Sequence, residues 1–461
     1  MYYGSHLILV NINIGPYNSQ VNYPSTATIE VHHAGAWHPA AELHALGHNR
    51  VRFNYLDQYV FGDIHLPVSL TLPVGLWPPA RVQGLTGLEP DHRPPSFLYD
   101  MVPQGKGRKF LLSTLNLADT DEMIMPLVMA GAFNPIGCLR LDTAMNFYVQ
   151  EAAKNPDPQM VVGIGLADIT QRSDEFLNHI ALHSMLATGT TGVQGVAPKF
   201  LLTTDKEGRW FADMALPDEL AHEHWLVKLP RGKSDEDRSV LRNEAAYLRV
   251  AAAVGLRCKY APVLLGEMLF VRRFDREVMP GGGAQRLHQE SLASVIGQRG
   301  FGMAQSQQAL LAGVRRCVSD PARETLEFIK RDVLNLALRN TDNHARNTAV
   351  QRSPDGRVQL TPVFDFAPMF KDPEIVSRSC HWRDKAGVRQ SDWKQVIEQL
   401  ELPDNERASI AFELATFAKT VARLDVIARD CGVDADVLSQ CAKSIETQAR
   451  QLEVVSDIGN G

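Results

Sequence analysis

The pattern of hydrophobic and polar positions changes several times along the chain. Up to about residue 85, apolar and polar residues alternate in short runs such as "ATIEVHHAG" and "PVSLTLPVG". A period of two is typical of half-buried strands. From Pro90 to about Leu182 apolar residues recur every three or four positions, as in "DEMIMPLVMAGAF", which indicates helices. The pattern therefore predicts a small, mostly β unit followed by a helical segment.

Strand signals return between Thr188 and Asp275. The stretch "KFLLTTDKEGRWF" predicts a hairpin, and "HWLVKLP" and "EMLFVRRFD" predict buried strands. Between these two strands, "SVLRNEAAYLRVAAAVGL" has the spacing of an amphipathic helix that Gly255 ends. After the glycine run at 281–283 the pattern is helical throughout, except for a short strand in "RVQLTPVFDF".

These changes indicate an α+β fold, in which a helical segment separates two strand-rich segments and the C-terminal part is mostly helical.

Composition narrows the class of protein. The 461 residues are 44% hydrophobic and 22% charged, which is typical of a globular chain with several cores. A net charge of −6 argues against a general nucleic-acid binder. No apolar run of about 18 residues and no signal peptide are visible, so we expect a soluble cytoplasmic protein without a membrane partner. The six cysteines form no CxxC pair, which argues against a zinc ribbon or a disulfide framework.

The stretch "NLALRNTDNHARNTAV" places many polar residues directly after an apolar helix. In it, Asp342 and Asn347 are separated by the interval at which protein kinases carry their catalytic aspartate and their metal-binding asparagine. Asp365 follows at the end of an apolar strand, where a second carboxylate could join the same metal. The spacing favours a site for phosphoryl transfer.

A lysine inside a predicted strand supports this interpretation. Lys228 lies in "HWLVKLP", where a buried ammonium needs an anionic partner. Glu244, in the helix that follows, could supply it, as in the lysine–glutamate pair of kinases. Upstream, Gly189, Gly192 and Gly195 form a flexible loop whose amides could approach phosphates.

Each residue taken alone also has an ordinary structural interpretation. Asp342 could cap a helix, and Lys228 could extend from a strand edge to solvent. Glu244 could be a solvated helix residue, and the glycines could form a plain turn. These interpretations do not explain why all of these residues occur together, in the order in which protein kinases carry them along the chain.

With these motifs the chain resembles the HipA toxins of bacterial type II toxin–antitoxin modules, which are serine/threonine protein kinases. The resemblance covers most of residues 27–375, and "TDNHARN" is close to the family's T-D-x-H-x-K-N catalytic loop. It implies a two-lobed divergent kinase-like fold. Its N-lobe is strand-rich and carries an added small β subdomain, and its C-lobe is mostly helical. Together with the pattern, the resemblance divides the chain into residues 1–26 as an N-terminal extension, 27–110 as the small β unit, 111–187 as a helical connecting segment, 188–278 as the strand-rich lobe and 279–461 as the mostly helical lobe.

The resemblance also implies the roles of individual residues, with ATP and Mg²⁺ as cofactors. Asp342 is then the catalytic base, Lys228 the phosphate-binding lysine, and Asn347 and Asp365 the magnesium ligands. The residues expected to contact the nucleotide are Gln194, Gly195, Val196, Lys199, Lys228, Glu244, Arg272, Arg273, Phe274, His344, Arg346, Asn347, Phe364 and Asp365.

The chain departs from the family pattern in two places. Many members carry glutamate where this chain has Arg272. The phosphate loop can be aligned from Gly192, which keeps Gln194, or from Gly195, which keeps Lys199 and which we favour because the following strand also aligns. In that alignment the family's autophosphorylated serine corresponds to Gly192, with Thr190 and Thr191 beside it.

The implied function is phosphorylation of a serine or threonine in a cytoplasmic protein, such as an aminoacyl-tRNA synthetase, which slows translation and growth. The implied partner is a small helix-turn-helix antitoxin, and DNA is contacted only through it. Two alternatives stay open: a nucleotide-binding interaction module with little transferase activity, and a small-molecule kinase on the same scaffold.

Overall fold

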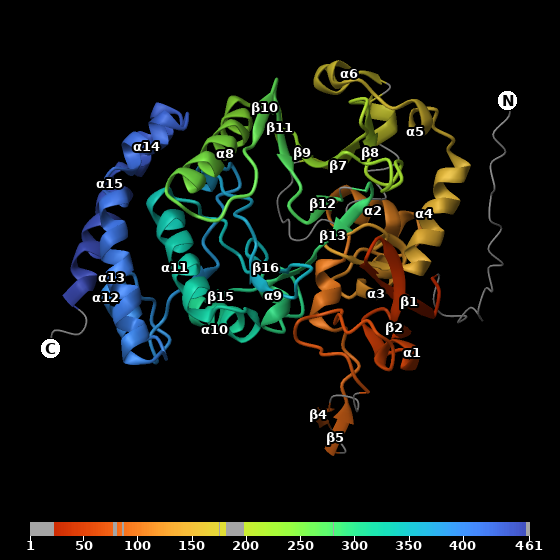
Figure 1. Ribbon diagram of the computed structural model, residues 1–461, viewed down its shortest axis with the longest axis horizontal. Helices are drawn as coiled ribbons and strands as arrows, with labels where there is room; N and C mark the ends of the chain where they lie inside the picture. The colour runs from red at the N-terminus through yellow and green to blue at the C-terminus, as the bar shows by residue number, and fades with distance from the viewer. Residues whose placement is uncertain are drawn as a thin grey trace.

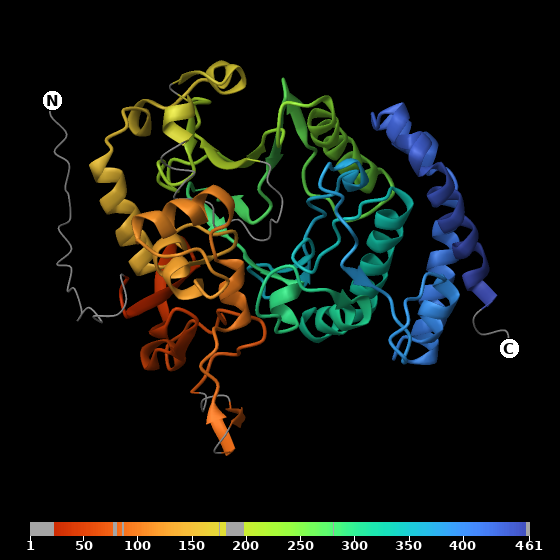
Figure 2. The same cartoon turned by 180° about the vertical axis from the view of Figure 1, so that it is seen from behind.

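Three bodies make up the described part of the chain. The structure is a computed structural model that describes residues 23–76, 81–84, 87–174, 176–180, 198–279 and 281–457. Figure 1 shows an N-terminal domain in red and orange, a strand-rich lobe in green and a helical lobe in cyan and blue. Figure 2, seen from behind, shows the strand-rich lobe above and between the other two.

An antiparallel sheet with the order β3-β2-β1-β6 is the base of the N-terminal domain. The elements of this domain are β1 (Thr26–His33), β2 (Ala36–Gly47), β3 (Arg50–Tyr55), α1 (Asp57–Val60), β4 (Arg81–Gly84), β5 (Gly87–Pro90), η1 (Ser96–Asp100), α2 (Gly105–Thr114), α3 (Ile124–Gly131), β6 (Leu139–Leu141) and α4 (Asp142–Lys154). Ile29 and Val31 of β1 are fully buried. The alternation in "ATIEVHHAG" is thus that of a half-buried strand, as predicted.

One hydrophobic core runs through this domain from Tyr23 to Tyr148. The aromatic rings of Phe133 and Tyr148 stack within it, with centroids 4.6 Å apart. The boundary expected at residue 110 falls inside α2 and inside this core. The segment from 111 to 154 therefore belongs to the domain and is not a connector, because α3 and α4 bury apolar surface against the strands.

The stretch "PVSLTLPVG" is not the strand that its alternation predicts. It forms only an isolated bridge between Ser69 and Leu72. Its polar groups face Glu290 of the helical lobe instead: Ser69 Oγ and Leu70 N each donate a hydrogen bond of 2.8 Å to that carboxylate. A segment whose amide is used in this way cannot continue a regular ladder.

The strand-rich lobe is a five-stranded antiparallel sheet in the order β10-β11-β9-β7-β8. Its elements are β7 (Lys199–Thr204), β8 (Trp210–Ala212), β9 (Glu223–Lys228), α8 (Asp235–Ala253), β10 (Val263–Leu265) and β11 (Met268–Arg272), preceded by α5 (Gln159–Val162) and α6 (Leu166–Gln171). Ser234 and Asp237 form a capping box at the start of α8. Gly255, at φ 86°, follows its end. The hairpin, the two strands and the helix between them agree with the sequence prediction.

The helical lobe is built on one large core. Its elements are β12 (Arg276–Val278), β13 (Ala284–Arg286), β14 (His288–Ser291), α9 (Leu292–Val295), β15 (Gln305–Ser306), α10 (Gln307–Cys317), α11 (Pro321–Ala337), β16 (Ala349–Arg352), β17 (Val358–Leu360), η2 (Met369–Lys371), β18 (Cys380–His381), α12 (Trp393–Glu398), α13 (Asp404–Val421), α14 (Leu424–Asp430), α15 (Ala435–Glu453) and η3 (Val454–Asp457). The sequence predicts only the strand at β17. The structure adds β14 and β16, which complete a three-stranded sheet with it. Strands this short have too few residues for a clear period.

The N-terminal domain is fixed to the rest of the chain by buried polar contacts. Ser96 Oγ donates to the carbonyl oxygen of Ser294 (2.8 Å). Gly137 N donates to Asp275 Oδ2, also at 2.8 Å. Groups removed from water need such partners, so these contacts define how the domain docks. No helix in the described ranges is both long and apolar enough to cross a membrane.

Candidate functional site

Four charged side chains meet where the strand-rich lobe faces the helical lobe. Lys228 Nζ donates to Glu244 Oε1 (2.5 Å) and to Asp365 Oδ1. Lys199 Nζ lies 3.6 Å from Asp365 Oδ2. Lys199 and Lys228 are paired across the adjacent strands β7 and β9, so their side chains leave the sheet on the same face. The structure thus brings the predicted lysine–glutamate pair and the predicted metal-binding aspartate into one cluster.

The helix that carries Glu244 is held by the helical lobe. Tyr247 OH, one turn further along α8, donates to the carbonyl oxygen of Leu338 (2.9 Å). Asn243 Nδ2 donates to Asp434 Oδ2 at the start of α15 (2.8 Å). These two contacts fix the rotation of α8, and Glu244 therefore faces Lys228 instead of solvent.

Burial and charge oppose each other in this cluster. Burial disfavours the charge on Lys228, but Asp365 and Glu244 outweigh it and raise the pKa of Lys228. Asp365 is also enclosed, yet Lys199 and Lys228 hold the pKa of its carboxyl well below the usual range. Burial lowers the pKa of Lys199 in spite of Asp365. The cluster therefore contains two lysines and two carboxylates. At such a site a bound anion can replace a carboxylate as the partner of a lysine.

The loop after α11 supplies the other predicted groups. The helix ends at Ala337. Asn340 Nδ2 then donates to Asn335 Oδ1 (2.9 Å), and Asn340 Oδ1 accepts from Asp342 N (3.3 Å). Asn347 Nδ2 donates to the main-chain oxygen of Asp342 (2.8 Å). The asparagines therefore hold the loop in shape, and Asn347 Oδ1 is left for another partner.

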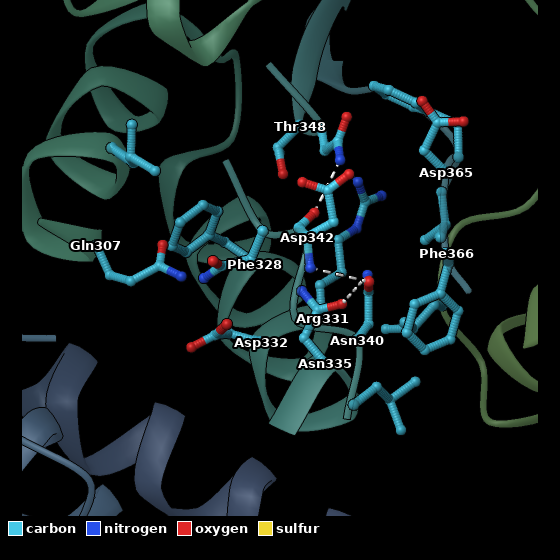
Figure 3. Close-up of a pocket in the computed structure, with 17 residues that line it drawn as sticks. Gln307, Phe328, Arg331, Asp332, Asn335, Asn340, Asp342, Thr348, Asp365 and Phe366 are labelled. Atoms are coloured by element: carbon cyan, nitrogen blue, oxygen red, sulfur yellow. Dashed lines mark hydrogen bonds between the residues drawn. The ribbon is translucent and has the colours of Figure 1, made fainter. Parts of the chain in front are cut away.

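Asp342 has a histidine beside it. His344 Nε2 lies 3.6 Å from Asp342 Oδ1. His344 Nδ1 accepts from Arg346 N (3.2 Å), which places the proton of the neutral ring on Nε2, toward Asp342. Burial lowers the pKa of His344, against the opposing effect of Asp342, and favours the neutral ring. The ring can therefore orient the Asp342 carboxylate, which lines the pocket of Figure 3 together with Asn340 and Asp365.

Beside the charged cluster lies an apolar pocket. It is lined by Ile136, Leu226, Leu248, Val271, Phe274 and Phe364, together with Lys199, Lys228, Glu244 and Asp365. The rings of Phe274 and Phe364 are 6.0 Å apart between centroids. An apolar pocket that opens onto two lysines suits an aromatic ring linked to phosphates. Ile136 comes from the N-terminal domain, and nothing in its local sequence marks it as a pocket residue.

Several predicted nucleotide contacts lie elsewhere or outside the described residues. Gln194, Gly195 and Val196 are outside them. Arg272 also lines the apolar pocket, but its guanidinium pairs with Glu223 (3.1 Å).

Two further arginines have their guanidinium groups in buried ion pairs. Arg273 lines the apolar pocket, but its guanidinium pairs with Asp213 and Asp275 (both 2.8 Å). Arg346, in the loop after α11, pairs with Asp100 of the N-terminal domain (2.5 Å) and does not line the pockets around Asp342 and Lys228. In both cases the guanidinium forms an ion pair with a buried carboxylate.

The oxygen atoms present fit a hard divalent cation. Asp365 offers a carboxylate that stays ionised, and Asn347 offers an amide oxygen, and both are ligand types that Mg²⁺ accepts. Within the described residues no group of three or more His, Cys, Asp or Glu forms a metal cage. Two protein ligands, completed by phosphate and water oxygens, are the usual way in which Mg²⁺ is held at nucleotide sites.

One protein family and several known proteins are similar to this chain. The family model described as HipA-like C-terminal domain matches residues 191–422. The kinase-named protein Y4mE of Sinorhizobium fredii is 23% identical over 344 residues, which cover 71% of this chain and 74% of that protein. The kinase-named protein Y4dM of the same organism is 24% identical over 348 residues, which cover 71% of this chain and 74% of that protein.

Among solved structures, the chain is similar to HipA of Shewanella oneidensis MR-1, which was solved with HipB and its operator DNA. The TM-score is 0.57 at 18% sequence identity, over 94% of this chain and 96% of that one. The likeness shows an α+β, two-lobed kinase-like fold extended by an N-terminal domain. Since the family model matches half of the chain, the protein belongs to the HipA family, with residues 191–422 as its HipA-like C-terminal domain.

Proposed function

We propose that this protein is an ATP-dependent serine/threonine protein kinase and the toxin of a type II toxin–antitoxin module. The observation that carries the proposal is the convergence of Asp342, Asn347, Asp365 and Lys228 on one cleft, in the arrangement that phosphoryl transfer requires. The kinase names of the relatives support the same class of reaction.

In the proposed reaction the nucleotide base occupies the apolar pocket and its phosphates face Lys199 and Lys228. Asp342 accepts the proton of the attacking hydroxyl, and Lys228 offsets the charge on the transferred phosphoryl group. Asn347 and Asp365 would hold Mg²⁺, which would supply further neutralisation of the phosphate charge. Positioning and electrostatic stabilisation thus account for the catalysis, and no covalent intermediate on the protein is needed.

Labelled ATP tests the reaction and the class of acceptor together. The purified protein is incubated with γ-labelled ATP, Mg²⁺ and a cell lysate, and the label is followed by gel and by chromatography. We expect label on one protein band, as phosphoserine or phosphothreonine. Label in a soluble metabolite would instead identify a small-molecule kinase, and nucleotide binding without any transfer would identify an interaction module.

The partner that we propose is a small helix-turn-helix protein that connects this chain to DNA. The support is the solved neighbour, which was crystallised with HipB and operator DNA. The net charge of −6 favours an indirect DNA contact over a direct one. We expect a tagged copy to co-purify with one small basic protein from its native cells, and operator DNA to be retained only when that protein is present. Retention of DNA by the chain alone would contradict this arrangement.

A further inference from the structure

The side chain of Arg346 connects the catalytic loop to a different domain. Arg346 lies directly before Asn347 in the chain, but its guanidinium turns into the interface with the N-terminal domain. There Nη1 donates to Asp100 Oδ1 (2.5 Å) and Nη2 donates to the carbonyl oxygen of Gly300 (3.0 Å). The guanidinium also lies over the ring of Phe301, 5.0 Å from its centroid. Arg346 is 4% exposed and Asp100 6% exposed, so the ion pair is removed from solvent.

The carboxylate of Asp100 is itself held in place by hydrogen bonds. It is the last residue of η1, and it accepts hydrogen bonds from Ser291 N (2.8 Å) and Ser291 Oγ (2.7 Å) of the helical lobe. Burial raises the pKa of Asp100, and Arg346 acts against that effect. A buried carboxylate that accepts three hydrogen bonds, one of them from a cationic partner, has a defined position, and so does the arginine that it binds.

The position of Arg346 is transmitted through the loop to the reacting groups. Arg346 N donates to His344 Nδ1 (3.2 Å), and Asn347 N donates to the carbonyl oxygen of His344 (2.9 Å). Asn347 Nδ2 in turn holds the main-chain oxygen of Asp342 (2.8 Å). A shift of Arg346 therefore changes the ring of His344 and the amide of Asn347 at once, and both of these face Asp342.

We infer that Asp100, a residue of the N-terminal domain, is a positioning residue for phosphoryl transfer and acts through Arg346. The inference rests on the proposed function of the cleft. Asp100 does not touch the pockets that would hold the nucleotide. Its effect should therefore be on the rate of transfer and not on nucleotide affinity. Displacing reacting groups by about 1 Å is enough to lower a rate by about 100-fold.

The test compares Asp100→Asn with the wild type in two separate measurements. Nucleotide affinity and binding stoichiometry are measured by titration calorimetry with Mg²⁺ and ATP, and kcat is measured by label transfer per molecule that binds nucleotide. We expect kcat to fall by about 100-fold with the affinity within about two-fold of the wild type. Arg346→Lys, which keeps the charge but cannot also reach Gly300, should lose less, about 10-fold, and it serves if Asp100→Asn does not fold.

A matched control separates positioning from loose domain docking. Ser96→Ala removes a buried hydrogen bond from the same helix η1 to the same lobe, without touching Arg346. We expect it to keep the wild-type kcat. The double variant Asp100→Asn with Arg346→Lys should be no slower than the slower of the two single variants, because the two residues act as one unit.

Folded Asp100→Asn with the wild-type kcat would overturn the inference, as would an equal loss in Ser96→Ala or a parallel loss of nucleotide affinity. Absence of transfer in the wild type itself would overturn the proposed function and this inference with it. The two failures are therefore distinguishable.

Discussion

Replacing Asp342 with asparagine is expected to lower phosphoryl transfer by about 1,000-fold, within the range that a general base contributes. The amide has nearly the same size but cannot accept the proton of a hydroxyl. The main-chain oxygen of Asp342, which Asn347 Nδ2 holds at 2.8 Å, is unaffected by the change. The loop should keep its shape, and nucleotide affinity should stay close to that of the wild type. Label transfer and titration calorimetry on the same preparation measure the two quantities.

The control for this variant is Asp355→Asn, the same substitution in an exposed turn of the same lobe. Asp355 accepts a hydrogen bond from Arg357 N, and no pocket described above includes it. The control should transfer phosphate at the wild-type rate. If purified Asp342→Asn also did so, the assignment of Asp342 as the base would be wrong, and His344 would be the next group to test.

The second large effect is expected for Asp365→Asn. This change removes the charge of the carboxylate that Lys199 and Lys228 now share. It also removes the proposed anionic ligand for Mg²⁺, whose stabilisation of the transition state is worth several kcal/mol. We expect transfer to fall by at least about 1,000-fold, which corresponds to roughly 4 kcal/mol.

Nucleotide binding distinguishes this variant from Asp342→Asn. For the wild type and for Asp342→Asn, adding Mg²⁺ should strengthen the binding of ATP. For Asp365→Asn that gain should be lost, while binding without Mg²⁺ should remain because both lysines are present. Titrations with and without a chelator measure the difference. An undiminished gain from Mg²⁺ in Asp365→Asn would show that the cation is held by other groups.

Much of the strand-rich lobe could be predicted from the sequence because its signals are local. Lys228 sits in an apolar run too short for a helix, and α8 shows its period and its glycine stop within one window. The pairing of Lys228 with Glu244 could be predicted as well, since a lysine in a buried strand requires an anion nearby. The need of a buried ammonium for an anionic partner, together with the local periodicity, was sufficient to predict these features.

Other features could not be predicted because they depend on how distant segments dock. Ile136 looks like any apolar residue in a loop, yet it lines the pocket beside Phe274. The boundary expected at residue 110 separates a mostly β segment from a helical one, but strands and helices on both sides of it share one core. A change of secondary structure does not by itself separate domains.

The direction of a loop side chain is equally hidden in the sequence. His344 and Arg346 are both polar residues of one loop, two positions apart. No signal in the sequence predicts that their side chains point in different directions. In the structure His344 faces Asp342, whereas Arg346 faces away. A loop has no fixed period that would assign faces, so the direction of Arg346 depends on its buried partners, Asp100 and the carbonyl oxygen of Gly300.

The ion pair between Asp100 and Arg346 also affects how the molecule reaches its final form. The two residues are 246 positions apart in the chain. The buried residues of the N-terminal core end at Tyr148, so all of them are synthesised well before Arg346. Contacts between residues so far apart form late, because a long loop must close first. The loop that contains Asp342 and Asn347 should therefore be among the last parts of the molecule to reach its final conformation. A partly synthesised chain would not yet carry out the proposed phosphoryl transfer.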